Sequence, residues 1–226
     1  MECLPINTYK EEKEQSVFFL IDVSNSQNIG EKKKMNITKE IASVLCLSAI
    51  RKNSQVGILC YSDKKELFIQ PKKGNSHAYR IIKELYRLNN TSNKTNLNEM
   101  FKYFNSTIKK KSLVIIVSDF LDKNFKNTLK SLSNKHDVIC IHVEDKNEKR
   151  IPNLGLIEIE NNESKIKKWV NTSSSDFNQI KEKTFKYKEN ELQKFLKKIN
   201  TNYLKISSDS DYVKDLIKLF KFRNNN

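Results

Sequence analysis

The chain has 226 residues, of which 37% are hydrophobic and 31% charged, which suits one sizeable domain or, alternatively, two small ones. Its apolar runs are strand-length and fall short of the roughly 20 residues that span a membrane, and 1–15 lacks the apolar segment of a secretory signal. We therefore expect a cytoplasmic protein with no transmembrane segment. The net charge of +15 raises the possibility of a nucleic-acid partner.

The cysteines and histidines show no spacing typical of a metal site. The cysteines are Cys3, Cys46, Cys60 and Cys140, and the histidines are His77, His136 and His142. No two cysteines form a Cys-x-x-Cys pair, and the last three lie in apolar segments. We expect reduced thiols in the core, with neither a disulfide framework nor a zinc site.

The first half of the chain alternates short apolar runs, typical of buried strands, with amphipathic segments typical of helices. In chain order it predicts a strand at 16–22, a helix at 32–52, strands at 56–61 and 67–69, a helix at 79–88, a loop at 89–94 and a helix at 97–108. The helix at 32–52 carries the spacing of one inward face. That face comprises Ile37, Ile41, Val44, Leu45 and Ser48.

The second half continues the alternation. It predicts a strand at 113–118, a helix at 125–132, a strand at 138–143, a charged loop at 145–150, short strands at 156–159 and 166–170 as an edge hairpin, a helix at 177–199, a strand at 203–206 and a helix at 212–222. Strands alternating with helices indicate an α/β fold, with a mainly parallel central sheet and helices on both faces. Without a repeat or a Pro- or Gly-rich linker, we expect one domain over 1–226.

Three polar motifs stand where strands end or helices begin. They are Asp22-Val23-Ser24-Asn25-Ser26 after the first strand, Thr95-Asn96-Leu97 before a helix, and Ser118-Asp119-Phe120 after the strand at 113–118. Binding sites of open parallel sheets form outside the carboxyl ends of the strands, so the motifs should converge. Their hydroxyl and carboxylate oxygens suit a hard divalent cation such as Mg²⁺. Such residues also cap helices and shape turns, so each motif alone is weak support for a metal site.

Further short motifs accompany these three along nearly the whole chain. They are 9–14, Gly30, Val56-Gly57-Ile58, Tyr61-Ser62-Asp63, 71–74 with His77, Leu121-Asp122, His136-Asp137-Val138, Asp145, Glu148, Pro152, Gly155 and Thr172-Ser173. With this set the chain resembles the von Willebrand factor A-like proteins of the bacterial domain-of-unknown-function-58 family, which are often found beside MoxR-type AAA+ ATPases.

The resemblance implies a Rossmann-like von Willebrand factor A-type domain, in which 1–15 is a lead-in shorter than that of relatives. It also implies a metal-dependent adhesion site (MIDAS) for Mg²⁺ or Mn²⁺. The implied ligands are Asp22, Ser24, Ser26, Thr95 and Asp119. The implied role is protein assembly or maturation with the ATPase, through a partner that offers an acidic residue. Two positions depart from the family pattern: Lys94 stands where a glycine often precedes the threonine, and Asn96 replaces a common aspartate.

Two other functions remain open from the residues alone. A Mg²⁺-dependent hydrolase or nuclease fits the ligand types, but the sequence holds no phosphate-binding loop, nucleotide fingerprint or nucleophile elbow. A nucleic-acid binder fits the excess of lysine, and Trp169 beside Lys167 and Lys168 is suited to stacking on a base. The lysines are scattered with acidic residues between them, which argues against a dedicated nucleic-acid site. The missing catalytic motifs argue against an enzyme. We therefore favour a non-enzymatic protein-interaction module with a metal site.

Overall fold

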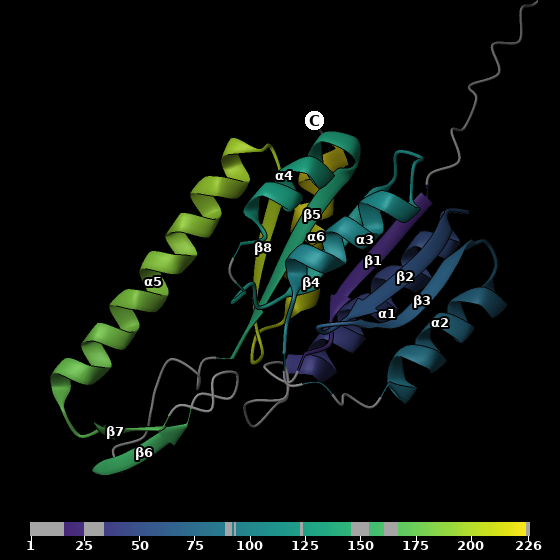
Figure 1. The fold of residues 1–226 in the computed structure, drawn as a ribbon. Coiled ribbons are helices and arrows are strands. Elements are labelled where there is room, and N and C mark those ends of the chain that lie inside the picture. Colours follow the sequence, from purple (N-terminus) through teal and green to yellow (C-terminus); the bar gives the residue numbers. More distant parts are fainter. Residues whose placement is uncertain are drawn as a thin grey trace, which may run out of the picture.

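The computed structural model describes residues 16–24, 34–88, 92, 94–122, 124–145, 154–160 and 167–224. In chain order, its elements are β1 (Ser16–Asp22), α1 (Lys34–Arg51), β2 (Gln55–Tyr61), β3 (Lys65–Lys72), α2 (Asn75–Arg87), α3 (Leu97–Thr107), β4 (Leu113–Ser118), α4 (Lys126–Lys135), β5 (Asp137–Glu144), β6 (Leu156–Glu160), β7 (Lys167–Asn171), α5 (Ser175–Lys198), β8 (Asn202–Ser207) and α6 (Tyr212–Asn224). Figure 1 shows them arranged around one central sheet. The predicted α/β class is confirmed.

The central sheet has six strands in the order β3-β2-β1-β4-β5-β8. Neighbouring strands are parallel except for β3, which pairs antiparallel with β2. The chain moves from β1 outward to β2 and β3, and later returns to the other side of β1 with β4. The sheet therefore has a switch point between β1 and β4, the place where open α/β sheets bind ligands.

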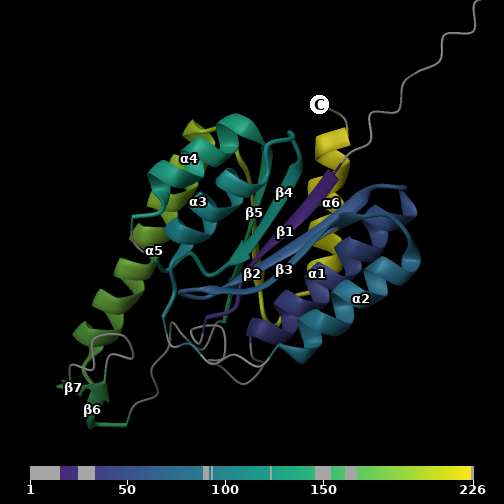
Figure 2. The ribbon, with the colours of Figure 1, turned by 45° about the vertical axis from the view of Figure 1, so that its right-hand side comes forward.

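Side chains that alternate along β1 enter two separate cores, because successive residues of a strand point to opposite faces. Phe19 and Ile21 pack with α1, α2 and α6, whereas Phe18 and Leu20 pack with α3, α4 and α5. Figure 2 shows the two groups of helices on opposite sides of the sheet. Every residue of β1 is buried, so this strand forms the rigid centre of the domain.

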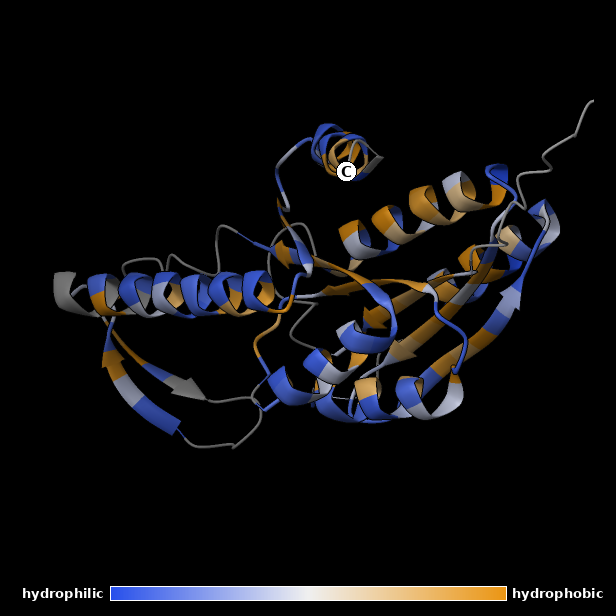
Figure 3. Ribbon diagram, turned by 90° about the horizontal axis from the view of Figure 1, so that it is seen from above, coloured by the Kyte–Doolittle hydropathy of each residue, from blue (hydrophilic) through white to orange (hydrophobic). Residues whose placement is uncertain are grey.

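Helix α5 packs on the sheet through its C-terminal half. Leu192 and Leu196 are buried, whereas Ile180 in its first half and Tyr187 at its midpoint are 64% and 68% exposed. At 24 residues the helix is about 36 Å long. Its N-terminal half therefore extends away from the sheet toward β6 and β7 (Figure 1). In Figure 3 the hydrophobic colour concentrates on the central strands, while α5 is mostly hydrophilic.

Some sequence expectations were wrong in detail. Strands β6 and β7 form a two-stranded antiparallel sheet of their own and do not extend the central sheet, because β8 takes the position beside β5. Helix α2 begins at Asn75, earlier than predicted. Val44 is 44% exposed, because the buried stripe of α1 runs along Ile41 and Leu45. Most of the predicted loops at 89–94 and 145–150 lie outside the described residues.

The thiols of three cysteines are buried and free, as predicted. They belong to Cys46, Cys60 and Cys140, and Cys3 lies outside the described residues. Among the helices that the structure describes, none combines the length and apolar character that a membrane crossing needs.

Candidate metal centre

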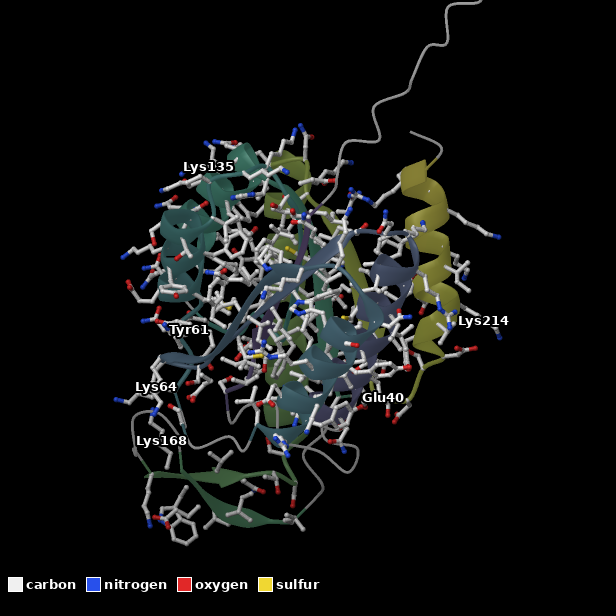
Figure 4. The ribbon with its side chains drawn as sticks, turned by 90° about the vertical axis from the view of Figure 1, so that its right-hand side faces the viewer. Glu40, Tyr61, Lys64, Lys135, Lys168 and Lys214 are labelled. Atoms are coloured by element: carbon white, nitrogen blue, oxygen red, sulfur yellow. The ribbon has the colours of Figure 1, made fainter. Side chains whose placement is uncertain are left out.

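The first and third motifs lie side by side at the switch point of the sheet. β1 and β4 are parallel neighbours, with Ile21 opposite Val117, so both strands end at the same edge. Figure 4 shows Tyr61 and Lys64 near this carboxyl-end edge, while Lys135 lies at the opposite end of the molecule. The predicted convergence of these two motifs is confirmed.

Asp22 is a fully buried carboxylate held by hydrogen bonds to both of its oxygens. The Ser118 hydroxyl donates to Oδ2 at 2.8 Å, and the backbone N–H of Ser24 donates to Oδ1 at 3.0 Å. The next residue, Val23, donates its N–H to the carbonyl of Tyr61 at 2.9 Å, which fixes the chain as it leaves β1. Burial, and secondly the negative charge of Asp119, raise the pKa of Asp22 to about 6.

Asp119 is the second carboxylate, only 4% exposed. Its Oδ2 accepts a hydrogen bond from the Lys34 ammonium at 2.9 Å, and its Oδ1 accepts one from the backbone N–H of Leu121 at 3.3 Å. The Ser118 hydroxyl also accepts from the N–H of Phe120 at 3.0 Å. Phe120 has φ 52°, in the left-handed region that a bulky residue rarely adopts. The turn after β4 is thus held in a strained conformation that presents Asp119 to the site.

The second motif is tied to the same edge by backbone hydrogen bonds. Asn96 caps α3, because its Oδ1 accepts from the N–H of Glu99 at 3.0 Å, and its own N–H donates to the carbonyl of Ser62 at 2.9 Å. The N–H of Leu97 donates to Asp122 Oδ2 at 2.7 Å. These contacts hold the half-buried Thr95 between the turn after β2 and the loop after β4.

Sequence reasoning missed Lys34 and the structural role of Asp122. Lys34 ends a run of three lysines, 32–34, of a kind that is ordinarily solvated, yet its side chain is fully buried. The sequence feature that could have indicated this burial is the helical spacing of Lys34, Thr38 and Ile41, all of which are buried on one face of α1. Lys94, one of the two departures from the family pattern, is exposed.

The donor chemistry fits a hard divalent cation. Ser24, Thr95, Asp22 and Asp119 offer hydroxyl and carboxylate oxygens, the ligands that Mg²⁺ prefers. Ser26 lies outside the described residues. In the part of the chain that is described, no three Asp, Glu, His or Cys side chains gather as a metal-binding group. A cation here would therefore depend on the hydroxyl donors, and metal binding stays a prediction.

The comparisons with known proteins agree with this architecture. An aerotolerance-related membrane protein from Bacteroides fragilis, with multiple mutations to serines, superposes with a TM-score of 0.60 at 14% identity, over 92% of this chain and 99% of that chain. The conserved hypothetical protein BatB from Bacteroides thetaiotaomicron gives 0.54 at 12% identity, with the same coverage of 92% and 99%. No curated protein matches the sequence significantly. Residues 1–190 match the family model described as "Protein of unknown function DUF58", so the chain belongs to the DUF58 family, with a von Willebrand factor A-type fold.

Proposed function

We propose that the protein is an interaction module that binds an acidic side chain of a partner protein through a divalent cation. The observation that supports it most is the buried pair of carboxylates, Asp22 and Asp119, at the switch point of the sheet. Keeping two carboxylates together in the interior costs free energy, as the raised pKa of Asp22 indicates. A cation bound by the two carboxylates would offset this cost, which gives a physical reason for placing them together.

The proposed ligands divide into charged and neutral groups. Asp22 and Asp119 supply charge, and Ser24, Ser26 and Thr95 supply hydroxyl oxygens. Mg²⁺ or Mn²⁺ with mostly neutral direct ligands stays electrophilic and attracts a further carboxylate. The protein's own contribution is rigidity, since Ser118 and the backbone at Ser24 fix the orientation of Asp22.

The partner that we propose is an acidic surface of an assembly ATPase of the MoxR type. The proposal rests on the family resemblance, and the net charge of +15 favours association with an acidic protein. The related Bacteroides fragilis structure is named as aerotolerance-related. A role in assembling or maturing other proteins would be compatible with a module that has no catalytic task, and the absence of enzymatic activity stays a prediction.

Thermal unfolding with and without Mg²⁺ or Mn²⁺ tests the metal dependence. Ten millimolar ion on a site with a millimolar Kd adds about 1.4 kcal/mol, which raises Tm by about 3–6 °C for a chain of this length. Asp22→Asn keeps the size of the side chain but removes its charge and should abolish the rise. Asp215→Ala, a change at a half-buried position on α6 where the carboxylate pairs with Lys218, is the control and should keep it.

Binding to the ATPase gives the second measurement. Capture of the ATPase should be lost on chelation and in Asp22→Asn, and kept in Asp215→Ala. Capture that persists both after chelation and in Asp22→Asn contradicts the proposal. Retention of nucleic acid with steep salt dependence and no need for metal would favour a nucleic-acid binder instead.

A further inference from the structure

The candidate site contains a cation that belongs to the chain itself. Lys34 is the first residue of α1, its side chain is fully buried, and its Nζ lies 2.9 Å from Asp119 Oδ2. Lysine is almost never fully buried unless it is paired. An ammonium in the interior costs several kcal/mol of desolvation, which good geometry with a carboxylate has to offset. A lysine in this place therefore calls for an explanation beyond surface charge.

The packing of α1 holds Lys34 in place. Thr38 and Ile41 follow it on the same helical face and are fully buried against the core. The helix would have to rotate or separate from the sheet to move the whole residue into solvent. Only the flexible side chain of Lys34 can withdraw from Asp119 without disturbing this packing.

We propose that Lys34 is a built-in counter-ion of the carboxylate edge, which competes with the divalent cation for Asp119. This inference rests on the proposed metal site. The ammonium contacts Oδ2 of Asp119, one of the two carboxylates in the proposed ligand set. Among the residues that the structure describes here, two carboxylates and one ammonium sum to one net negative charge, and a divalent ion would bring the sum to one net positive charge. Without the lysine, a divalent ion would neutralise the two carboxylates fully, so the lysine weakens metal binding and stabilises the metal-free site.

The test compares Lys34→Met with Lys39→Met by titration of Mn²⁺ in a calorimeter. Lys34→Met removes the ammonium and keeps a long side chain. Lys39→Met makes the same change on α1 at a lysine that contacts the carbonyl of Leu88 and the ring of Tyr86, and serves as the control. We expect Lys34→Met to lower the Kd for Mn²⁺ by about tenfold or more, a change of about 1.4 kcal/mol or more, and Lys39→Met to leave it unchanged.

Thermal unfolding supplies a readout that does not depend on tight binding. Without metal, Lys34→Met should unfold at a lower temperature than the wild type, because it leaves a buried carboxylate without its counter-ion. Mn²⁺ should restore that temperature. If Lys34→Met does not fold without metal, the double variant Lys34→Met with Asp119→Asn removes both charges. It should fold and should lack the tightened binding.

The outcomes separate this inference from the proposed function. Mn²⁺ binding by Lys34→Met but not by the wild type supports the role of Lys34 and contradicts a metal-dependent function of the wild type. Equal Kd values for Lys34→Met and the wild type overturn the role of Lys34 and leave the metal site standing. Absence of binding in every variant overturns both.

Discussion

Replacing Ser118 by alanine tests how the protein keeps a buried carboxylate in place. The Ser118 hydroxyl donates to Asp22 Oδ2 at 2.8 Å, and both residues are buried. The change to alanine removes the donor and leaves a carboxylate oxygen without this hydrogen bond in the interior. It also removes the acceptor of the Phe120 N–H, but it creates almost no cavity. The lost hydrogen bonds should dominate the effect on stability, and the one to the carboxylate is the stronger of the two.

The size of the effect follows from the charge of the acceptor. A hydrogen bond to a charged group contributes about 1.5–3 kcal/mol, against about 1 kcal/mol for a bond between neutral groups. Ser118→Ala should therefore lower Tm by about 3–12 °C at neutral pH. Ser112, at the other end of β4, is also buried and donates to the carbonyl of Lys110 at 2.9 Å. Ser112→Ala loses a neutral bond and is expected to cost about 1 kcal/mol.

Urea unfolding in metal-free buffer measures both variants, each with Asp22 intact and with Asp22→Asn. Loss of the Asp22 charge should reduce the cost of Ser118→Ala to that of Ser112→Ala. Acid should also reduce the cost of Ser118→Ala, because burial and the charge of Asp119 raise the pKa of Asp22 to about 6. Near pH 4.5 the folded protein therefore carries a neutral carboxyl, and the bond to Ser118 becomes a neutral one.

Equal costs for Ser118→Ala and Ser112→Ala at pH 7.5, unchanged by Asp22→Asn, would refute this reasoning. Such a result would mean that Asp22 is already neutral at pH 7.5, or that water replaces the hydroxyl. Either answer would also weaken the case for a pair of charged carboxylates at the metal centre.

Two further predictions concern the core and the pH dependence of stability. Gly57→Ala places a Cβ 2.6 Å from a ring carbon of Phe18 and 3.0 Å from the carbonyl oxygen of Ile69. It should therefore lower the free energy of unfolding, measured by thermal unfolding, by about 1–3 kcal/mol. If adding Phe18→Leu recovers none of this loss, the clash is not its cause. Burial lowers the pKa of His142 to about 4, below the ordinary 6.5 of the unfolded chain, so its contribution is complete above pH 6.5 and is lost as pH falls toward 4. The loss amounts to at most about 3 kcal/mol. Urea unfolding at pH 7.5 and 4.5 should therefore show that the wild type loses more stability on acidification than His142→Gln, and an equal loss in both would mean that this assignment is wrong.

The sequence was enough to predict the elements and the class of fold, because both depend on local patterns. The apolar run at 113–118 could only be a buried strand, and its observed bounds are Leu113–Ser118. Alternation of strands and helices leaves few topologies besides a parallel sheet covered on both faces. The same rules put Asp22 and Asp119 at one edge, since both follow parallel strands.

Only the tertiary structure decided which charges meet. Lys34 and Asp119 are 85 residues apart, and Ser118 and Asp22 are 96 apart, so no local pattern relates them. A lysine at a helix start is usually solvated, and it becomes a buried counter-ion only when the helix packs its first turn against the end of β4. The position of the β6–β7 hairpin was also decided by tertiary structure. Two short strands could extend the central sheet or form a sheet of their own, and the second occurs because β8 occupies the edge beside β5. Periodicity determines which face of an element is apolar, whereas the packing of distant elements determines which polar groups share the interior.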